Sequence, residues 1–118
     1  MKAIKINATV VLNNGLTVSS GSCLTIDSAN INNKRDFGSD LPIAILTSLY
    51  NSETDYSDGK NSITDIKDFN SLFQGSISVV VYETVNTEKM LIDFLIALLT
   101  PIYGASNLEV INIAPKAV

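Results

Sequence analysis

The chain has 118 residues, of which 46% are hydrophobic and 17% charged, and its formal net charge is −4. This composition fits one folded domain over residues 1–118 and excludes a disordered chain. Only eight Lys and Arg residues are spread along the sequence, so no dense basic patch forms and we expect no direct binding of nucleic acid. The chain has no His and one Cys, Cys23, which we interpret as a small, partly buried residue without a catalytic partner.

Alternating apolar and polar residues predict two strands at the start of the chain, over residues 4–12 and 16–26. Asn13-Asn14-Gly15 lies between them. A two-residue loop would place the two apolar rows on opposite faces of the ribbon, whereas a three-residue loop pairs Val10 with Val18. We therefore predict a three-residue loop whose glycine adopts a left-handed conformation.

Two polar stretches interrupt or follow the second of these strands. Ser20-Gly21-Ser22 keeps the alternation but offers no apolar side chain, which indicates a bend or bulge in a long strand. Residues 28–40 are rich in Asn and charged residues and are interpreted as a surface connection. Lys34 and Arg35 make this loop a candidate contact arm.

A third strand is predicted from Pro42 to Tyr50, with both faces mostly buried and proline at its start or at a sheet edge. The acidic segment 51–61 follows. Ser52 and Asp55 have the spacing of a capping box for one helical turn, and Asp55 and Tyr56 are candidates for a second contact arm. If Gly59 is the sixth position of a calcium-binding loop, the first and third positions are not acidic, so the EF-hand pattern fails.

Residues 62–74 have apolar spacing that fits either a helix or a strand, and we favour a short strand near 63–66 followed by a turn over 68–71. After Gly75, residues 76–85 predict a central strand covered on both faces, because three consecutive valines lie within it. A last strand is predicted over residues 108–113.

The stretch at about residues 87–100 predicts a helix that is apolar in most directions. Pro101 should stop or kink it, and Gly104 should mark its end. Asp93 is the only charged residue between Met90 and Leu99, and an ion pair with Lys89, or with a residue of a neighbouring subunit, would satisfy it. This run is too short, and its charge too central, for a membrane span.

The helix carries more apolar surface than one face of a sheet would bury. We therefore expect a second layer or a neighbouring copy of the chain to cover the remainder. The candidate interface residues on the helix are Met90, Leu91, Phe94, Leu95 and Leu98.

Together these elements predict an α+β fold: an antiparallel sheet, or a partly open barrel or sandwich, of about six strands, with the helix packed on it before the final strand. No phosphate-binding glycine loop, cysteine pair at metal spacing or Ser-His-Asp set is present. We expect no cofactor, no metal and no enzymatic activity. The remaining enzymatic hypothesis is carboxylate chemistry by Asp65, Asp68 and Asp93.

Three stretches resemble small structural proteins of tailed bacteriophages, of the neck, tail and baseplate type. They are the Asn- and Thr-rich hairpin of residues 4–26, the strand 41–50 with its acidic turn and Asp58-Gly59-Lys60, and the lone apolar helix before a final strand. The resemblance implies a non-enzymatic virion protein, made in the host cytoplasm, that assembles with itself and other virion proteins into a ring or other symmetric array.

An alternative hypothesis is a small soluble β-rich module that binds a ligand or carbohydrate through its Asn-rich loops. Tyr50, Tyr56 and Tyr82 would then have to gather in a cleft.

Overall fold

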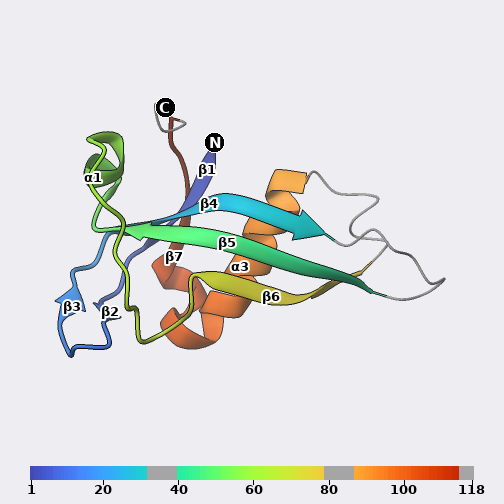
Figure 1. Ribbon diagram of the computed structural model, residues 1–118, viewed down its shortest axis with the longest axis horizontal. Helices are drawn as coiled ribbons and strands as arrows, with labels where there is room; N and C mark the ends of the chain where they lie inside the picture. The colour runs from blue at the N-terminus through green and yellow to red at the C-terminus, as the bar shows by residue number, and fades with distance from the viewer. Residues whose placement is uncertain (32–39, 79–86, 115–118) are drawn as a thin grey trace.

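The computed structural model describes residues 1–31, 40–78 and 87–114 (Figure 1). Short strands and one long helix account for most of this part of the chain. In chain order, the elements are β1 (Lys2–Ile6), β2 (Val10–Val11), β3 (Thr17–Val18), β4 (Ser22–Ile31), β5 (Leu41–Tyr50), α1 (Glu53–Ser57), β6 (Leu72–Ile77), α3 (Thr87–Tyr103), the 3-10 helix η1 (Ala105–Asn107) and β7 (Leu108–Asn112).

The main sheet has five strands in the order β6-β5-β4-β1-β7, and every neighbouring pair is antiparallel. β2 and β3 form a separate two-stranded sheet. Helix α3 lies across one face of the main sheet, so that the chain passes from β6 at one edge to β7 at the other (Figure 1). The predicted α+β class, with a helix packed on an antiparallel sheet before a final strand, is confirmed.

The three-residue loop of the first hairpin is also confirmed. Val10 pairs with Val18, the Leu12 N–H donates to the Leu16 carbonyl at 2.8 Å, and Gly15 has a φ of +86°. The same register continues beyond the predicted bend, where Gly21 has a φ of +105°. The side-chain parity of the two strands therefore determines the loop correctly.

The predicted polar connection after residue 28 is wrong in its first part, because β4 continues to Ile31. Its residues pair with β5 on both sides of a bulge between Ile26 and Ser28. Ten residues of β5 are available for pairing, and this backbone ladder outweighs the polar composition of the segment. Residues 32–39, including Lys34 and Arg35, lie outside the described residues.

β5 is buried on one face rather than on both. Leu41, Ile43 and Ile45 are among the buried residues of the face that packs against α3, whereas Leu46 on the other face is 43% exposed. Pro42 is tolerated at the second residue of the strand, as expected for a proline near a strand start. Among the described residues, α1 covers this face only at the Tyr50 end of the strand, and the region around Leu46 stays exposed.

The start of the predicted central strand over residues 76–85 is wrong, and its described part belongs to an edge strand. β6 starts at Leu72, Gly75 lies inside it opposite Ile43, and β6 is an edge strand. Residues 79–85 lie outside the described residues. The segment 63–66 is neither helix nor regular strand, and contributes only isolated bridges from Ile63 and Ile66. Pairing with β5 determines where β6 begins and ends, and the local sequence pattern does not reveal this pairing.

Helix α3 runs two residues past Pro101, to Tyr103, and ends at Gly104, as predicted for its glycine. Gly104 has a φ of +85°, and its N–H donates to the Thr100 carbonyl at 2.8 Å. Proline removes one backbone donor, and in the final turn this loss does not break the helix.

Two apolar clusters lie on opposite faces of the sheet. The larger one packs five buried residues of α3 against β1, β4, β5 and β6; these helix residues are Met90, Leu91, Ile92, Leu95 and Leu99. The smaller one lies on the other face, where α1 covers one end of the sheet; its members are Ala3, Cys23, Tyr50, Tyr56 and Ile113. Successive side chains of each central strand therefore point alternately into the two cores.

Gly75 allows α3 to approach β6 closely. A Cβ atom built on Gly75 would lie 2.7 Å from Cζ of Phe94, well inside van der Waals contact. We expect Gly75→Ala to lower the free energy of unfolding by about 1–3 kcal/mol, because the ring must move away from its present packing. Urea denaturation would measure the loss.

A smaller side chain at position 94 provides the matched test of this contact. In a Phe94→Leu background, Gly75→Ala should cost much less than in the natural chain, which a double-mutant cycle would detect. Equal costs in the two backgrounds would show that the Phe94 ring does not determine the need for glycine.

Candidate functional site

Most of the helix residues predicted to form an interface are covered by the chain's own sheet. Met90, Leu91 and Leu95 are 3%, 9% and 0% exposed, and Phe94 is half-buried against Gly75. Of the five, only Leu98 is exposed, at 38%. The excess of apolar surface that the sequence assigns to a partner is therefore largely absorbed within one chain.

The predicted arm at α1 serves mainly to attach this helix to the sheet. Ser52 caps α1 by accepting the Asp55 N–H at 3.0 Å, as predicted from their spacing. Tyr56 is 3% exposed; its ring meets Tyr50 edge-on at 5.1 Å, and its hydroxyl donates to the Ala114 carbonyl at 3.0 Å. Tyr56 is therefore a core residue, and of the two candidate contact residues of this arm only Asp55 is half-exposed.

Two of the acidic residues considered for catalysis have structural partners. The carboxylate of Asp68 accepts the Val11 N–H at 3.2 Å and the Tyr103 hydroxyl at 2.9 Å, which links the hairpin to the end of α3. Burial, and then the hydrogen bond to Asp68, raise the pKa of Tyr103 well above its usual range. Asp93 pairs with Lys89 at 2.6 Å on the exposed side of α3, so the predicted ion pair within the helix is confirmed.

Cys23 lies in the smaller core beneath α1. Burial, and then the negative charge of Glu53, raise the pKa of its thiol to about 11. At neutral pH the thiol stays protonated and is a poor nucleophile. Among the described residues, no group of three or more Cys, Asp or Glu side chains is arranged to hold a metal ion.

A pocket of about 390 Å³ opens beside β5, where β6 stops pairing with it. The last pair of these strands joins Leu46 to Leu72. Beyond it, two backbone hydrogen bonds join the chain to β5: the Thr47 N–H donates to the Ser71 carbonyl at 2.8 Å, and the Leu49 carbonyl accepts the Ile63 N–H at 2.6 Å. Between these two anchors the segment 64–70 turns away from the sheet, and the pocket fills the gap.

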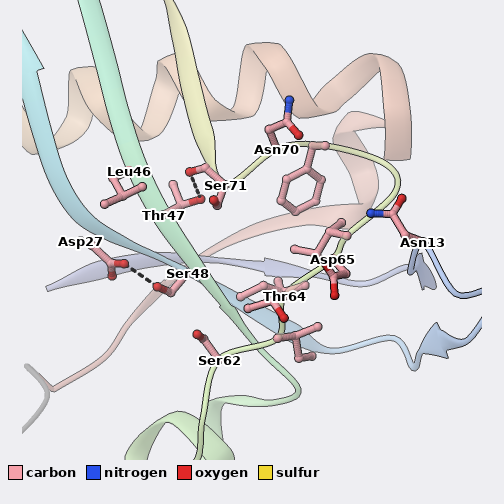
Figure 2. A pocket seen from close by; sticks show the side chains of 14 residues that line it. Asn13, Asp27, Leu46, Thr47, Ser48, Ser62, Thr64, Asp65, Asn70 and Ser71 are labelled. Atoms are coloured by element: carbon pink, nitrogen blue, oxygen red, sulfur yellow. Dashed lines mark hydrogen bonds between the residues drawn. The ribbon is translucent and has the colours of Figure 1, made fainter.

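Polar side chains from the sheet and from the segment 62–71 surround this pocket (Figure 2). Asp27 projects from the bulge in β4, and its carboxylate accepts hydrogen bonds from the Ser48 hydroxyl and, at 3.5 Å, from the Thr25 hydroxyl. The full lining consists of Asn13, Asp27, Leu46, Thr47, Ser48, Leu49, Ser62, Ile63, Thr64, Asp65, Ile66, Phe69, Asn70 and Ser71.

Asp65 is the one non-glycine residue with a positive φ, +58°, in the described part of the chain. Its carbonyl accepts the Asn13 N–H at 2.7 Å, and the nearby Lys67 N–H donates to Val11 at 2.9 Å. These bonds clamp the segment onto the first hairpin and hold Asp65 at the pocket wall. The described residues that line the pocket thus include Asp27 and Asp65, which are both exposed, and no Lys or Arg.

The sequence pattern does not reveal this pocket. Asp27 falls in the polar row of a strand, and Ser28 is the residue that breaks the apolar alternation, which could have indicated the bulge; the partner of Asp27, Ser48, lies more than twenty residues away. The tyrosine cleft required by the alternative hypothesis does not form from the described tyrosines. Tyr50 and Tyr56 lie in the smaller core, and Tyr82 is outside the described residues.

The outer edge of β6 is a second candidate surface. We use "the β6 edge surface" for Leu72–Ile77 together with Leu46, the cross-strand partner of Leu72. No described strand pairs with the outer side of β6, and β6 contains neither a charged residue nor a proline. Leu72 is 46% exposed and Leu46 43%.

Neither described helix has the combination of length and apolar character needed to cross a membrane. Comparisons with protein families, with curated proteins and with solved structures found no match to this chain.

Proposed function

We propose that this chain is a non-enzymatic structural component of a tailed-phage particle that assembles with copies of itself into a ring or other symmetric array. The β6 edge surface is the observation that supports self-assembly. The three stretches that resemble neck, tail and baseplate proteins support the placement in a virion.

An open edge strand is a template for pairing with another chain. Proteins that must remain monomeric protect such edges with lysine, proline or bulges, and the sequence of β6, Leu-Phe-Gln-Gly-Ser-Ile, offers none of these. Pairing of this edge would satisfy backbone groups and bury Leu72 and Leu46. Full burial of a leucine contributes about 1.5–3 kcal/mol, and burial of the part of each side chain that is now exposed would contribute a fraction of this free energy.

Strand direction limits the possible arrangements. Because each neighbour in the five-stranded sheet is antiparallel, β6 and β7 at the two edges run in the same direction. A ring that continues the sheet from copy to copy joins β6 of one copy to β7 of the next as a parallel pair. An antiparallel pair instead joins β6 to β6 across a two-fold axis and closes at a dimer.

Light scattering of the purified protein over a wide range of concentration tests this proposal. We expect a defined multimer or growing assemblies, and we expect Leu72→Lys to shift the mass towards the 12.7 kDa monomer, because a lysine at the edge opposes strand pairing. The control is Leu98→Lys, which places the same charge at an exposed leucine of α3 and should leave the assembly intact.

A natural chain that stays monomeric at every concentration would contradict self-assembly through β6. Dissociation by Leu98→Lys but not by Leu72→Lys would place the interface on α3 instead. The placement in a virion has a separate test, which is detection of the chain by mass spectrometry in purified phage particles.

A further inference from the structure

We propose that the pocket between β5 and the segment 62–71 binds a small organic cation, with an alkyl chain that ends in a guanidinium or primary ammonium group. The pocket shares Leu46 with the β6 edge surface, but the proposal does not depend on self-assembly. It rests on the charge, the apolar surface and the shape of the pocket.

The negative charge of the pocket favours a positively charged ligand. Asp27 and Asp65 come from segments far apart in sequence, and the described lining residues include no cationic side chain that could neutralise them. No described Lys or Arg forms an ion pair with either carboxylate. Two exposed carboxylates at a pocket whose described lining has no cationic side chain attract a cation and repel phosphates or carboxylates.

Asp27 is already oriented for this role. Hydrogen bonds from the Ser48 and Thr25 hydroxyls fix its carboxylate, and each carboxylate oxygen retains further capacity to accept hydrogen bonds. Guanidinium and ammonium groups supply only donors, so they complement such an acceptor. A preformed acceptor loses little conformational freedom when the ligand binds.

The rest of the lining suits an alkyl chain better than a sugar ring. Leu46, which is exposed, and Ile63 and Ile66, which are half-buried, provide apolar surface, and a volume of about 390 Å³ lies within the range of small-molecule sites. The described part of the lining offers no free aromatic face on which a sugar ring could stack. Phe69 is the one aromatic residue in the described lining; it is 8% exposed and already packs against Phe73 and Tyr103.

Titration of the ¹⁵N-labelled full chain with agmatine tests the proposal by NMR. We expect saturable shifts of the backbone amides around the pocket, at Asn13, Ser48, Ile63 and Asn70, that weaken as salt is added. 1,4-Butanediol has the same four-carbon chain without charge and should produce no saturable shifts. Equal responses to the two compounds, or none to agmatine, would overturn the proposal.

Charge-removing variants locate the site. Asp27→Asn preserves an acceptor for Ser48, and Asp65→Asn preserves the backbone, because Asn tolerates the left-handed region as well as Asp. Each should weaken agmatine binding by about fivefold or more, the effect of removing one close opposite charge near a protein surface. Asp93→Asn removes the same charge on the exposed side of α3 and should leave the affinity unchanged.

If Asp93→Asn weakens agmatine binding as much as the pocket variants do, the affinity depends only on the net charge of the protein, which would refute the site.

A parallel titration with the capped peptide Gly-Arg-Gly distinguishes a free metabolite from an arginine side chain of a partner. Tighter binding of agmatine supports the small-molecule cation, and tighter binding of the peptide contradicts it in favour of a protein ligand.

Discussion

Replacement of Leu95 by Asp is expected to abolish cooperative folding. Leu95 lies at the centre of α3, is 0% exposed and belongs to the larger core. The variant loses the burial of a leucine, about 2–5 kcal/mol, and places a carboxylate without a partner in an apolar site. Together these costs approach or exceed the total stability of a domain of this size, about 5–15 kcal/mol.

Far-UV circular dichroism and urea denaturation would measure this effect, with Leu98→Asp as the matched control. Leu98 is in the same helix but is 38% exposed, so its replacement should cost only about 1 kcal/mol. A folded, cooperatively unfolding Leu95→Asp protein would show that α3 does not pack on the sheet as described.

Replacement of Tyr56 by Ala is expected to have the second-largest effect, a loss of about 3–5 kcal/mol in the free energy of unfolding. Tyr56 is the buried residue of α1 and connects it to Tyr50 and to the carbonyl of Ala114. Without this ring, α1 loses its main attachment to the sheet. Tyr56→Phe isolates the hydroxyl, whose hydrogen bond should account for about 0.5–1.5 kcal/mol of the loss.

Cys23 provides a local measurement of the same change, because its thiol is buried in the cluster that Tyr56 covers. In the Tyr56→Ala protein we expect faster reaction with a thiol reagent under native conditions than in the natural chain or in Tyr56→Phe. Unchanged reactivity in a destabilised Tyr56→Ala protein would mean that α1 remains docked and that the destabilisation arises elsewhere.

Local periodicity was sufficient to predict α3 and the first hairpin. The apolar residues of α3 repeat at helical spacing, and the strand parity around Asn13-Asn14-Gly15 excludes a two-residue loop and favours the three-residue loop. The ion pair of Lys89 with Asp93 follows from the same spacing. Each of these features depends on residues that are close in sequence.

The placement of β6 and the pocket depends on long-range pairing, which no local pattern encodes. The residues of β6 alternate weakly and include a glycine, yet β5 extends far enough to pair with them. The pocket then exists because this pairing stops at Leu72 while the chain stays anchored at Leu49. Such a gap follows from the register of two strands, and that register is decided by tertiary packing.

The placement of β7 next to β1 has a consequence for biosynthesis. The last strand completes the sheet against the first, and the Ile113 N–H donates to the Met1 carbonyl at 2.8 Å. On the ribosome, β1 therefore has one unpaired edge until residues near 113 have left the exit tunnel. The sheet is therefore completed by a contact of large sequence separation, which favours slow folding.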